Sequence, residues 1–225
     1  MSQVGVVFDF NGTMFLDTDK QEKAWEIFIG TLNRSEIFAN DRLDIHGRCN
    51  REILSYLLGK DISSCELDVL SEQKEQIYRD LCEKDRKNLH LTRGLEDLLE
   101  TLKEYGIPRT IATSSGKSNL DFYIERFDLE KWFDIQKIVY DNGTFPGKPA
   151  PYVYHEAAKN IGVHTGDCVV FEDSFPGIQA ASQAGIGKII VITDYRKREA
   201  FAVMPEVYDA ITTFHDFDRL LLRNI

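Results

Sequence analysis

The chain has 225 residues, 43% of them hydrophobic and 28% charged, which is the balance of a soluble globular protein with a substantial core. Its net charge of −10 disfavours nucleic acid and anionic membranes, and we expect neither as a partner. The four cysteines form no CxxC pair, and the sequence shows neither a secretion signal nor an apolar run that could span a bilayer. We therefore expect a cytoplasmic protein, and a monomer.

The first half of the chain predicts one strand and then a helical segment. Residues 4–8 form a short, Val-rich apolar run stopped by polar residues and Gly12, which is typical of a buried parallel strand. From about Asp17 to Lys87 the apolar residues recur at helical spacing instead, with charges between them. The amphipathic stretches there are KAWEIFIGTLN, NREILSYLLGK and LSEQKEQIYRDLCEKD.

From residue 95 onward, helical and strand patterns alternate. The predicted strands are residues 109–113, 135–140, 168–173 and 188–193. The predicted helices are residues 95–106, 118–129, 150–162 and 177–185, with a last helix over 214–224. Such alternation predicts an α/β fold in which helices cover both faces of a parallel sheet, a Rossmann-like three-layer core. We assign residues 1–15 and 88–225 to this core, and 16–87 to a small inserted helical domain.

Polar residues stand at the carboxyl ends of three predicted strands, where open α/β sheets bind ligands. These residues are Asp9, Thr113 with Ser114, and Glu172 with Asp173. Lys148, in a loop punctuated by Gly and Pro, is a further candidate. Carboxylates suit Mg²⁺, and a lysine and hydroxyls suit a phosphate, so the set favours phosphoryl transfer with an aspartate as nucleophile.

The motifs DFNGT, TIATSS, GKPAPYVY and FEDSFPGIQAASQAG, in this order, resemble the four motifs of the haloacid dehalogenase superfamily. Together with the helical insertion, they resemble its β-phosphoglucomutase-like branch. The resemblance implies that Asp9 is the nucleophile that accepts the phosphoryl group, and that Thr113 and Lys148 hold that group. It implies Mg²⁺ as cofactor, bound by Asp9, the main-chain carbonyl of Asn11 and Asp173, and by Glu172 directly or through water.

The resemblance also implies that the insertion is a cap that closes over a small phosphorylated metabolite and selects it. Candidate substrate-binding residues are Gly12, Ser114, Ser115, Gln21, Gly47, Arg48 and Arg51. For the cap loop IHGRCNRE, either Arg48 or Arg51 could contact substrate, and His46 is a weaker candidate.

Position 11 departs from the family pattern. The family's phosphatases and mutases carry there an aspartate that acts as acid and base, whereas this chain has Asn11. An amide has no proton to transfer near neutral pH, and such transfer is worth about 10²–10⁴-fold in rate. We therefore expect a phosphatase acting on a sugar phosphate or a similar metabolite. Asn11 indicates a slow enzyme, a substrate whose leaving group needs no proton, or another group that supplies one. The alternatives are a phosphomutase, and a binding protein that has kept the site with little turnover.

Overall fold

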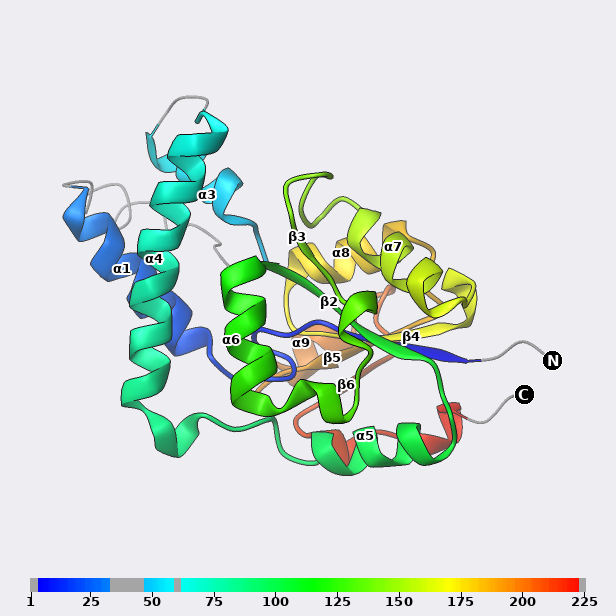
Figure 1. The fold of residues 1–225 in the computed structure, drawn as a ribbon. Coiled ribbons are helices and arrows are strands. Elements are labelled where there is room, and N and C mark those ends of the chain that lie inside the picture. Colours follow the sequence, from blue (N-terminus) through cyan, green and yellow to red (C-terminus); the bar gives the residue numbers. More distant parts are fainter. Residues whose placement is uncertain (1–3, 33–46, 59–61, 223–225) are drawn as a thin grey trace.

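The structure, a computed structural model, describes residues 4–32, 47–58 and 62–222. Within these residues, one parallel sheet has the strand order β3-β2-β1-β4-β5-β6 (Figure 1). The strands are β1 (Gly5–Phe8), β2 (Arg109–Gly116), β3 (Val139–Asp141), β4 (Cys168–Glu172), β5 (Lys188–Ile192) and β6 (Asp209–Ile211). The strand order reverses between β1 and β4, because β2 and β3 follow β1 to one side and β5 and β6 follow β4 to the other. In open α/β sheets, the ligand-binding crevice lies at the carboxyl ends of the strands at such a switch point.

Helices cover both faces of the sheet, because successive side chains of a strand point to opposite faces. Val6 and Phe8 join one apolar cluster with helices α5 (Leu95–Glu104) and α6 (Lys117–Phe127). Val7, between them, joins a second cluster with α7 (Tyr152–Ile161) and α8 (Phe175–Gln183). The short helix α9 (Arg198–Ala202) packs beside β6. These layers confirm the predicted α/β class.

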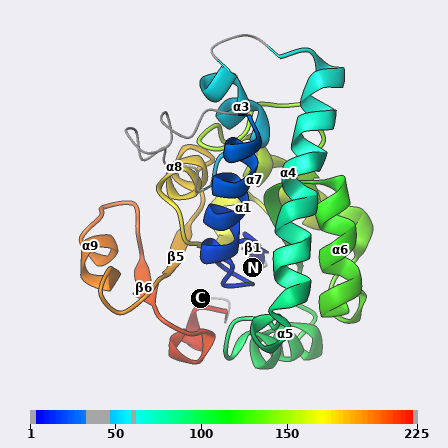
Figure 2. The ribbon, with the colours of Figure 1, turned by 90° about the vertical axis from the view of Figure 1, so that its left-hand side faces the viewer.

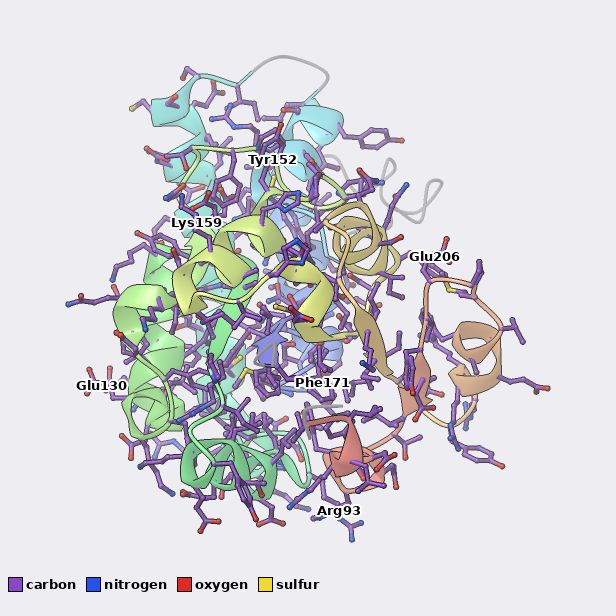
Figure 3. All side chains as sticks on the ribbon, turned by 90° about the vertical axis from the view of Figure 1, so that its right-hand side faces the viewer. Arg93, Glu130, Tyr152, Lys159, Phe171 and Glu206 are labelled. Atoms are coloured by element: carbon purple, nitrogen blue, oxygen red, sulfur yellow. The ribbon has the colours of Figure 1, made fainter. Side chains whose placement is uncertain are left out.

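Two aromatic rings stack across the central strands β1 and β4. Phe171 on β4 is fully buried, and its ring stacks on Phe8 of β1 at 5.1 Å and 8°. Figure 3 shows Phe171 in the interior, whereas Lys159 and Glu206 lie at the periphery. The stacked pair lies directly before Asp9 and Glu172 in the two strands, so it supports both carboxylates.

A helical unit lies beside the sheet edge where β1 ends (Figures 1 and 2). It contains α1 (Thr18–Thr31), α3 (Asn50–Leu58) and α4 (Ser64–Lys84). These helices share an apolar cluster of their own around Trp25, Phe28 and Leu54, separate from the two clusters on the sheet. The two connections to the sheet run together, since Thr92 donates from its N–H to Met14 O and from Oγ1 to Thr13 O, both at 2.8 Å.

Three details correct the sequence-based prediction. Residues 135–137 form a 3₁₀ turn and not a strand, because the Asp134 carboxylate accepts a hydrogen bond from the N–H of Gln136. The last helix is replaced by two 3₁₀ turns, Phe214–Asp216 and Arg219–Leu222. The strand β6 and helix α9 were not predicted. Among the described helices, none has the length and apolar character needed to cross a membrane.

Candidate active site

Asp9 and Lys148 form the centre of the site. Asp9 follows β1, and Lys148 Nζ lies 2.6 Å from Asp9 Oδ1 and 2.6 Å from Glu172 Oε1. All three side chains are buried. Burial alone would lower the pKa of Lys148, but the two carboxylates raise it, so the ammonium stays charged. Residues separated by 139 and 24 positions in the sequence thus meet at one sheet edge.

Both carboxylate oxygens of Glu172 accept hydrogen bonds. Its Oε1 accepts from Lys148 and from Tyr154 OH at 2.7 Å, and its Oε2 accepts from the N–H groups of Asp173 and Ser174 and from Ser174 Oγ. Burial would raise the pKa of Glu172, yet Lys148 and these hydrogen bonds hold it below its usual range. Gly177 in α8 lies against this carboxylate, and a Cβ there would overlap it.

Asp173 contrasts with Glu172. Its carboxylate accepts no hydrogen bond from any residue that the structure describes, although it is only partly exposed. Burial, together with the charges of Glu172 and Asp9, raises the pKa of Asp173. Burial, reinforced by Glu172 and opposed by Lys148, raises the pKa of Asp9 as well. Oxygens of Asp9, Glu172 and Asp173 lie within 4.8 Å of one another. The single positive charge of Lys148 does not balance three carboxylates, so the cluster fits a cation.

Gly12 lets the loop after β1 approach Asp173. It has a φ of +77°, and a Cβ at this position would overlap the Asp173 carboxylate. Its N–H donates to Asp17 Oδ1 at 2.9 Å and to the carbonyl of Phe15 at 2.8 Å. The N–H of Gly12, a candidate substrate-binding residue, therefore already has acceptors within the protein, and what Gly12 contributes is the close approach of the backbone to Asp173.

Asn11 is held by polar groups from both the core and the helical unit. Its Nδ2 donates to Asp17 Oδ2 at 2.7 Å and to Tyr123 OH at 2.8 Å, and Tyr78 OH of α4 lies at 3.3 Å. Its Oδ1 accepts from Ser115 Oγ at 2.8 Å. Because donor and acceptor ends have matching partners, the orientation of the amide is fixed.

The hydroxyl residues at the end of β2 join the same edge. Thr113 is buried, and its Oγ1 accepts from the N–H of Ser115 at 3.1 Å. Ser114 Oγ donates to the carbonyl of Gly47 at 3.1 Å, which links β2 to the segment before α3. Thr113, Ser114 and Ser115 therefore face the site from the strand beside β1.

A polar cavity of about 70 Å³ lies between this edge and the helical unit. Of the sequence-predicted residues, it is lined by Asp9, Asn11, Gly12, Gln21, Gly47, Arg48, Thr113, Ser114, Ser115 and Asp173. Lys148 and Glu172 are not among its lining residues, and Lys148 contacts Asp9, which is. Arg51 is not among the lining residues, and its Nη1 lies 3.5 Å from the carbonyl of Ile62. The geometry thus favours Arg48 over Arg51; His46 lies outside the described residues.

Sequence reasoning missed several lining residues, among them Asp17, Asn50, Lys74 and Glu75. The amphipathic pattern of residues 71–87 favours a solvent-exposed helix face for its charged residues, but Lys74 and Glu75 are buried. One signal could have found Lys74. It lies four residues before Tyr78 and eight before Cys82, on the buried stripe of α4.

Comparison with known proteins agrees with this geometry. Residues 4–185 match the family described as haloacid dehalogenase-like hydrolase. The chain belongs to this family. A haloacid dehalogenase hydrolase of family IA, variant 3, from Entamoeba histolytica has 34% sequence identity and a TM-score of 0.84, with 99% of this chain and 97% of that chain covered.

Other relatives in the haloacid dehalogenase family carry names that refer to phosphorylated compounds. The phosphorylated carbohydrates phosphatase of Thermotoga maritima is 32% identical over 52% of this chain and 50% of its own length. A mutant of CbbY from Rhodobacter sphaeroides, solved with xylulose-1,5-bisphosphate, shares the fold at 20% identity and a TM-score of 0.75, covering 95% of this chain and 96% of that one. The matches span about half the length of the first curated relatives.

Proposed function

We propose that this chain is a Mg²⁺-dependent phosphatase of a small phosphorylated metabolite, with Asp9 as the nucleophile. The observation that carries the proposal is the position of the Asp9 carboxylate. It lies at the end of a buried strand, with one oxygen on Lys148 and the cavity above it. A carboxylate oriented in this way can attack phosphorus in line and become an aspartyl phosphate.

The carboxylate cluster supports a bound Mg²⁺. Asp173 has no hydrogen-bond donor among the described residues, so it has the capacity of a direct ligand, with Asp9 and the carbonyl of Asn11. Both oxygens of Glu172 are occupied, so we assign to it the positioning of Lys148 and of the loop around Ser174. The metal would supply positive charge that offsets the charge of the phosphate.

Groups from β2 and from the insertion would complete the binding of substrate. Thr113 and Lys148 would hold the transferring phosphoryl group, and Ser114 and Ser115 would line its entrance. The helical unit, roughly residues 16–87, would act as the cap that selects the substrate, through Gln21, Arg48 and their neighbours. The names of the Thermotoga and Rhodobacter relatives support a phosphorylated carbohydrate as the substrate class.

The test is release of inorganic phosphate from a panel of sugar phosphates, acetyl phosphate and p-nitrophenyl phosphate, with Mg²⁺ and with EDTA. Wild type is compared with Asp9→Asn, which keeps the shape of the side chain but removes the nucleophile. We expect turnover that EDTA and Asp9→Asn each abolish. Turnover that survives in Asp9→Asn would overturn the assigned nucleophile.

A binding protein with little turnover is the second candidate, and the fixed amide of Asn11 favours it because that side chain supplies no acid. It predicts saturable thermal stabilisation by a sugar phosphate, without product, from a folded protein. Interconversion of two sugar phosphates after priming with a bisphosphate would instead identify a phosphomutase.

A further inference from the structure

Lys74 is a buried cation on the cap side of the cavity. Its side chain, on α4, is 2% exposed, and the cavity that it lines also contains Asp9. The ammonium lies 5.0 Å from the ring centre of Trp25 and 5.4 Å from that of Tyr78. A charge removed from water to this extent requires partners on all sides.

The hydrogen bonds of Lys74 are incomplete. An ammonium has three N–H donors. Two of them have acceptors, Gln21 Oε1 at 2.6 Å and Glu75 Oε1 at 3.2 Å. The described residues provide no acceptor for the third, and an unsatisfied buried donor is costly. A ligand atom in the cavity can accept from it.

The two acceptors of Lys74 are themselves held in place. Gln21 donates from Nε2 to Asp17 Oδ2 at 3.3 Å. Glu75 accepts from Asn50 Nδ2 at 2.9 Å and from Asn119 Nδ2 at 2.6 Å, the latter on α6 of the core. The ammonium is therefore oriented by both the helical unit and the core, as expected of a group that meets a reacting atom.

We infer that Lys74 is a catalytic residue that gives a proton to the leaving oxygen of the substrate. The inference rests on the proposed phosphatase function. The amide of Asn11 cannot supply a proton, and both of its ends are bonded. The other cation on the lining, Arg48, pairs with Glu52 at 3.6 Å and, as a guanidinium, does not give up its proton. Asp9 and Lys74 line the same cavity of about 70 Å³, so the ester oxygen of a phosphate bound on Asp9 would lie on the side of the helical unit.

The proton balance closes over two steps. In the first, a carboxylate oxygen of Asp9 bonds to phosphorus, the bond from phosphorus to the ester oxygen breaks, and that oxygen takes a proton from Lys74 and leaves as an alcohol. In the second, water attacks the phosphorus of the aspartyl phosphate, and the neutral amine of Lys74 takes its proton. Inorganic phosphate forms, and the Asp9 carboxylate and the Lys74 ammonium are both regenerated.

The first turnover of two substrates tests this role. A sugar phosphate leaves as an alkoxide that needs a proton, whereas p-nitrophenolate leaves without one. Lys74→Met keeps an apolar chain over Trp25, and Lys74→Arg keeps the charge but not a transferable proton. We expect both variants to slow the first turnover of the sugar phosphate by about 10²–10⁴-fold. Release of p-nitrophenol in the first turnover should change little.

The control is Lys20→Met. Lys20 is also a buried lysine of the helical unit, but it pairs with Asp85 at 3.1 Å and lies outside the cavity. Melting temperatures show whether each variant is folded. Equal losses with both substrates would assign Lys74 to binding or packing, and full activity of Lys74→Arg on the sugar phosphate would assign it to charge alone. Either result overturns the inference and leaves the phosphatase proposal intact, whereas a wild type inactive on both substrates overturns the two together.

Discussion

The amide nitrogen of Asn11 lies 2.7 Å from Oδ2 of Asp17, a carboxylate that also accepts from Tyr78 OH, Gln21 and the N–H of Gly12. Position 11 therefore needs a donor. We expect Asn11→Asp to place two carboxylates in contact and to lower the free energy of unfolding by about 1–3 kcal/mol. The double variant Asn11→Asp, Asp17→Asn exchanges the two groups and should recover most of that loss.

Urea denaturation of wild type, both single variants and the double variant gives the coupling energy of the pair. Asn11→Asp alone is the change that the family pattern suggests for restoring an acid. Because it confronts Asp17, we expect any gain in turnover to be larger in the double variant. An Asn11→Asp variant as stable as wild type would contradict this account of Asn11.

Lys148 neutralises two buried carboxylates, so its removal should be costly. We expect Lys148→Met to destabilise the protein by about 3–5 kcal/mol in EDTA, because Asp9 and Glu172 lose their shared cation. Mg²⁺ should restore part of the loss if it binds the same cluster. Lys159→Met is the matched control, since Lys159 is 73% exposed in a pair with Glu156 and should change stability by less than about 1 kcal/mol. Equal effects in the two variants would contradict the buried ion triad.

Stabilisation by Mg²⁺ should grow with pH. Burial raises the pKa of Asp9 from 3.8 to about 7, so without metal the folded state binds a proton more tightly than the unfolded state does. That contribution to stability is complete below about pH 4 and is lost as the pH rises towards 7. Mg²⁺ competes with the proton, and its effect is therefore weakest at acid pH. Melting temperatures from pH 5 to 8, with Mg²⁺ and with EDTA, measure this stabilisation by Mg²⁺. A rise in melting temperature that is independent of pH would contradict Mg²⁺ binding at Asp9.

Gly12→Ala should damage the proposed Mg²⁺ site, and its cost should exceed that of the left-handed backbone conformation alone. Gly12 and Gly143 both have positive φ, +77° and +73°, but a Cβ at Gly143 meets nothing within 4 Å, whereas at Gly12 it overlaps Asp173. Gly143→Ala should cost about 1–2 kcal/mol from the left-handed conformation. Gly12→Ala should cost more and should also weaken Mg²⁺ binding, measured by calorimetry. Equal losses would show that the Asp173 carboxylate moves aside freely.

The four cysteines should differ in reactivity. Cys65 is exposed, whereas burial raises the pKa of Cys49 to about 11 and those of Cys82 and Cys168 to about 12. Because the thiolate is the reactive form, we expect one thiol per chain to react promptly with Ellman's reagent in the native protein, and all four in denaturant. Prompt reaction of a second thiol would show that a buried one becomes accessible.

The sequence predicted the sheet and its edge well, because strands that end on Asp9 and Glu172 are apolar, short and bounded by polar residues. Lys74 could not be assigned in this way. A lysine within a charged helix is usually solvated, and its burial depends on Gln21, Trp25 and Glu75, which only the packed helices bring together. The weak strands were missed or misplaced for a similar reason, since local caps such as that of Asp134 compete with pairing at the sheet edge.

Thr92 fastens the returning connection of the helical unit to the outgoing one through Met14 and Thr13. The two ends of the insertion are thus joined beside β1, and further hydrogen bonds, from Asn119 of α6 to Glu75 and from Ser114 of β2 to Gly47, hold it against the core. A graft of different helices between residues 15 and 92 would keep Asp9, Glu172 and Lys148 in the chain, but it would replace the residues of α4 that reach the site. For protein engineering, an exchanged insertion would therefore have to retain Lys74, which lines the cavity, and Tyr78, which contacts Asn11.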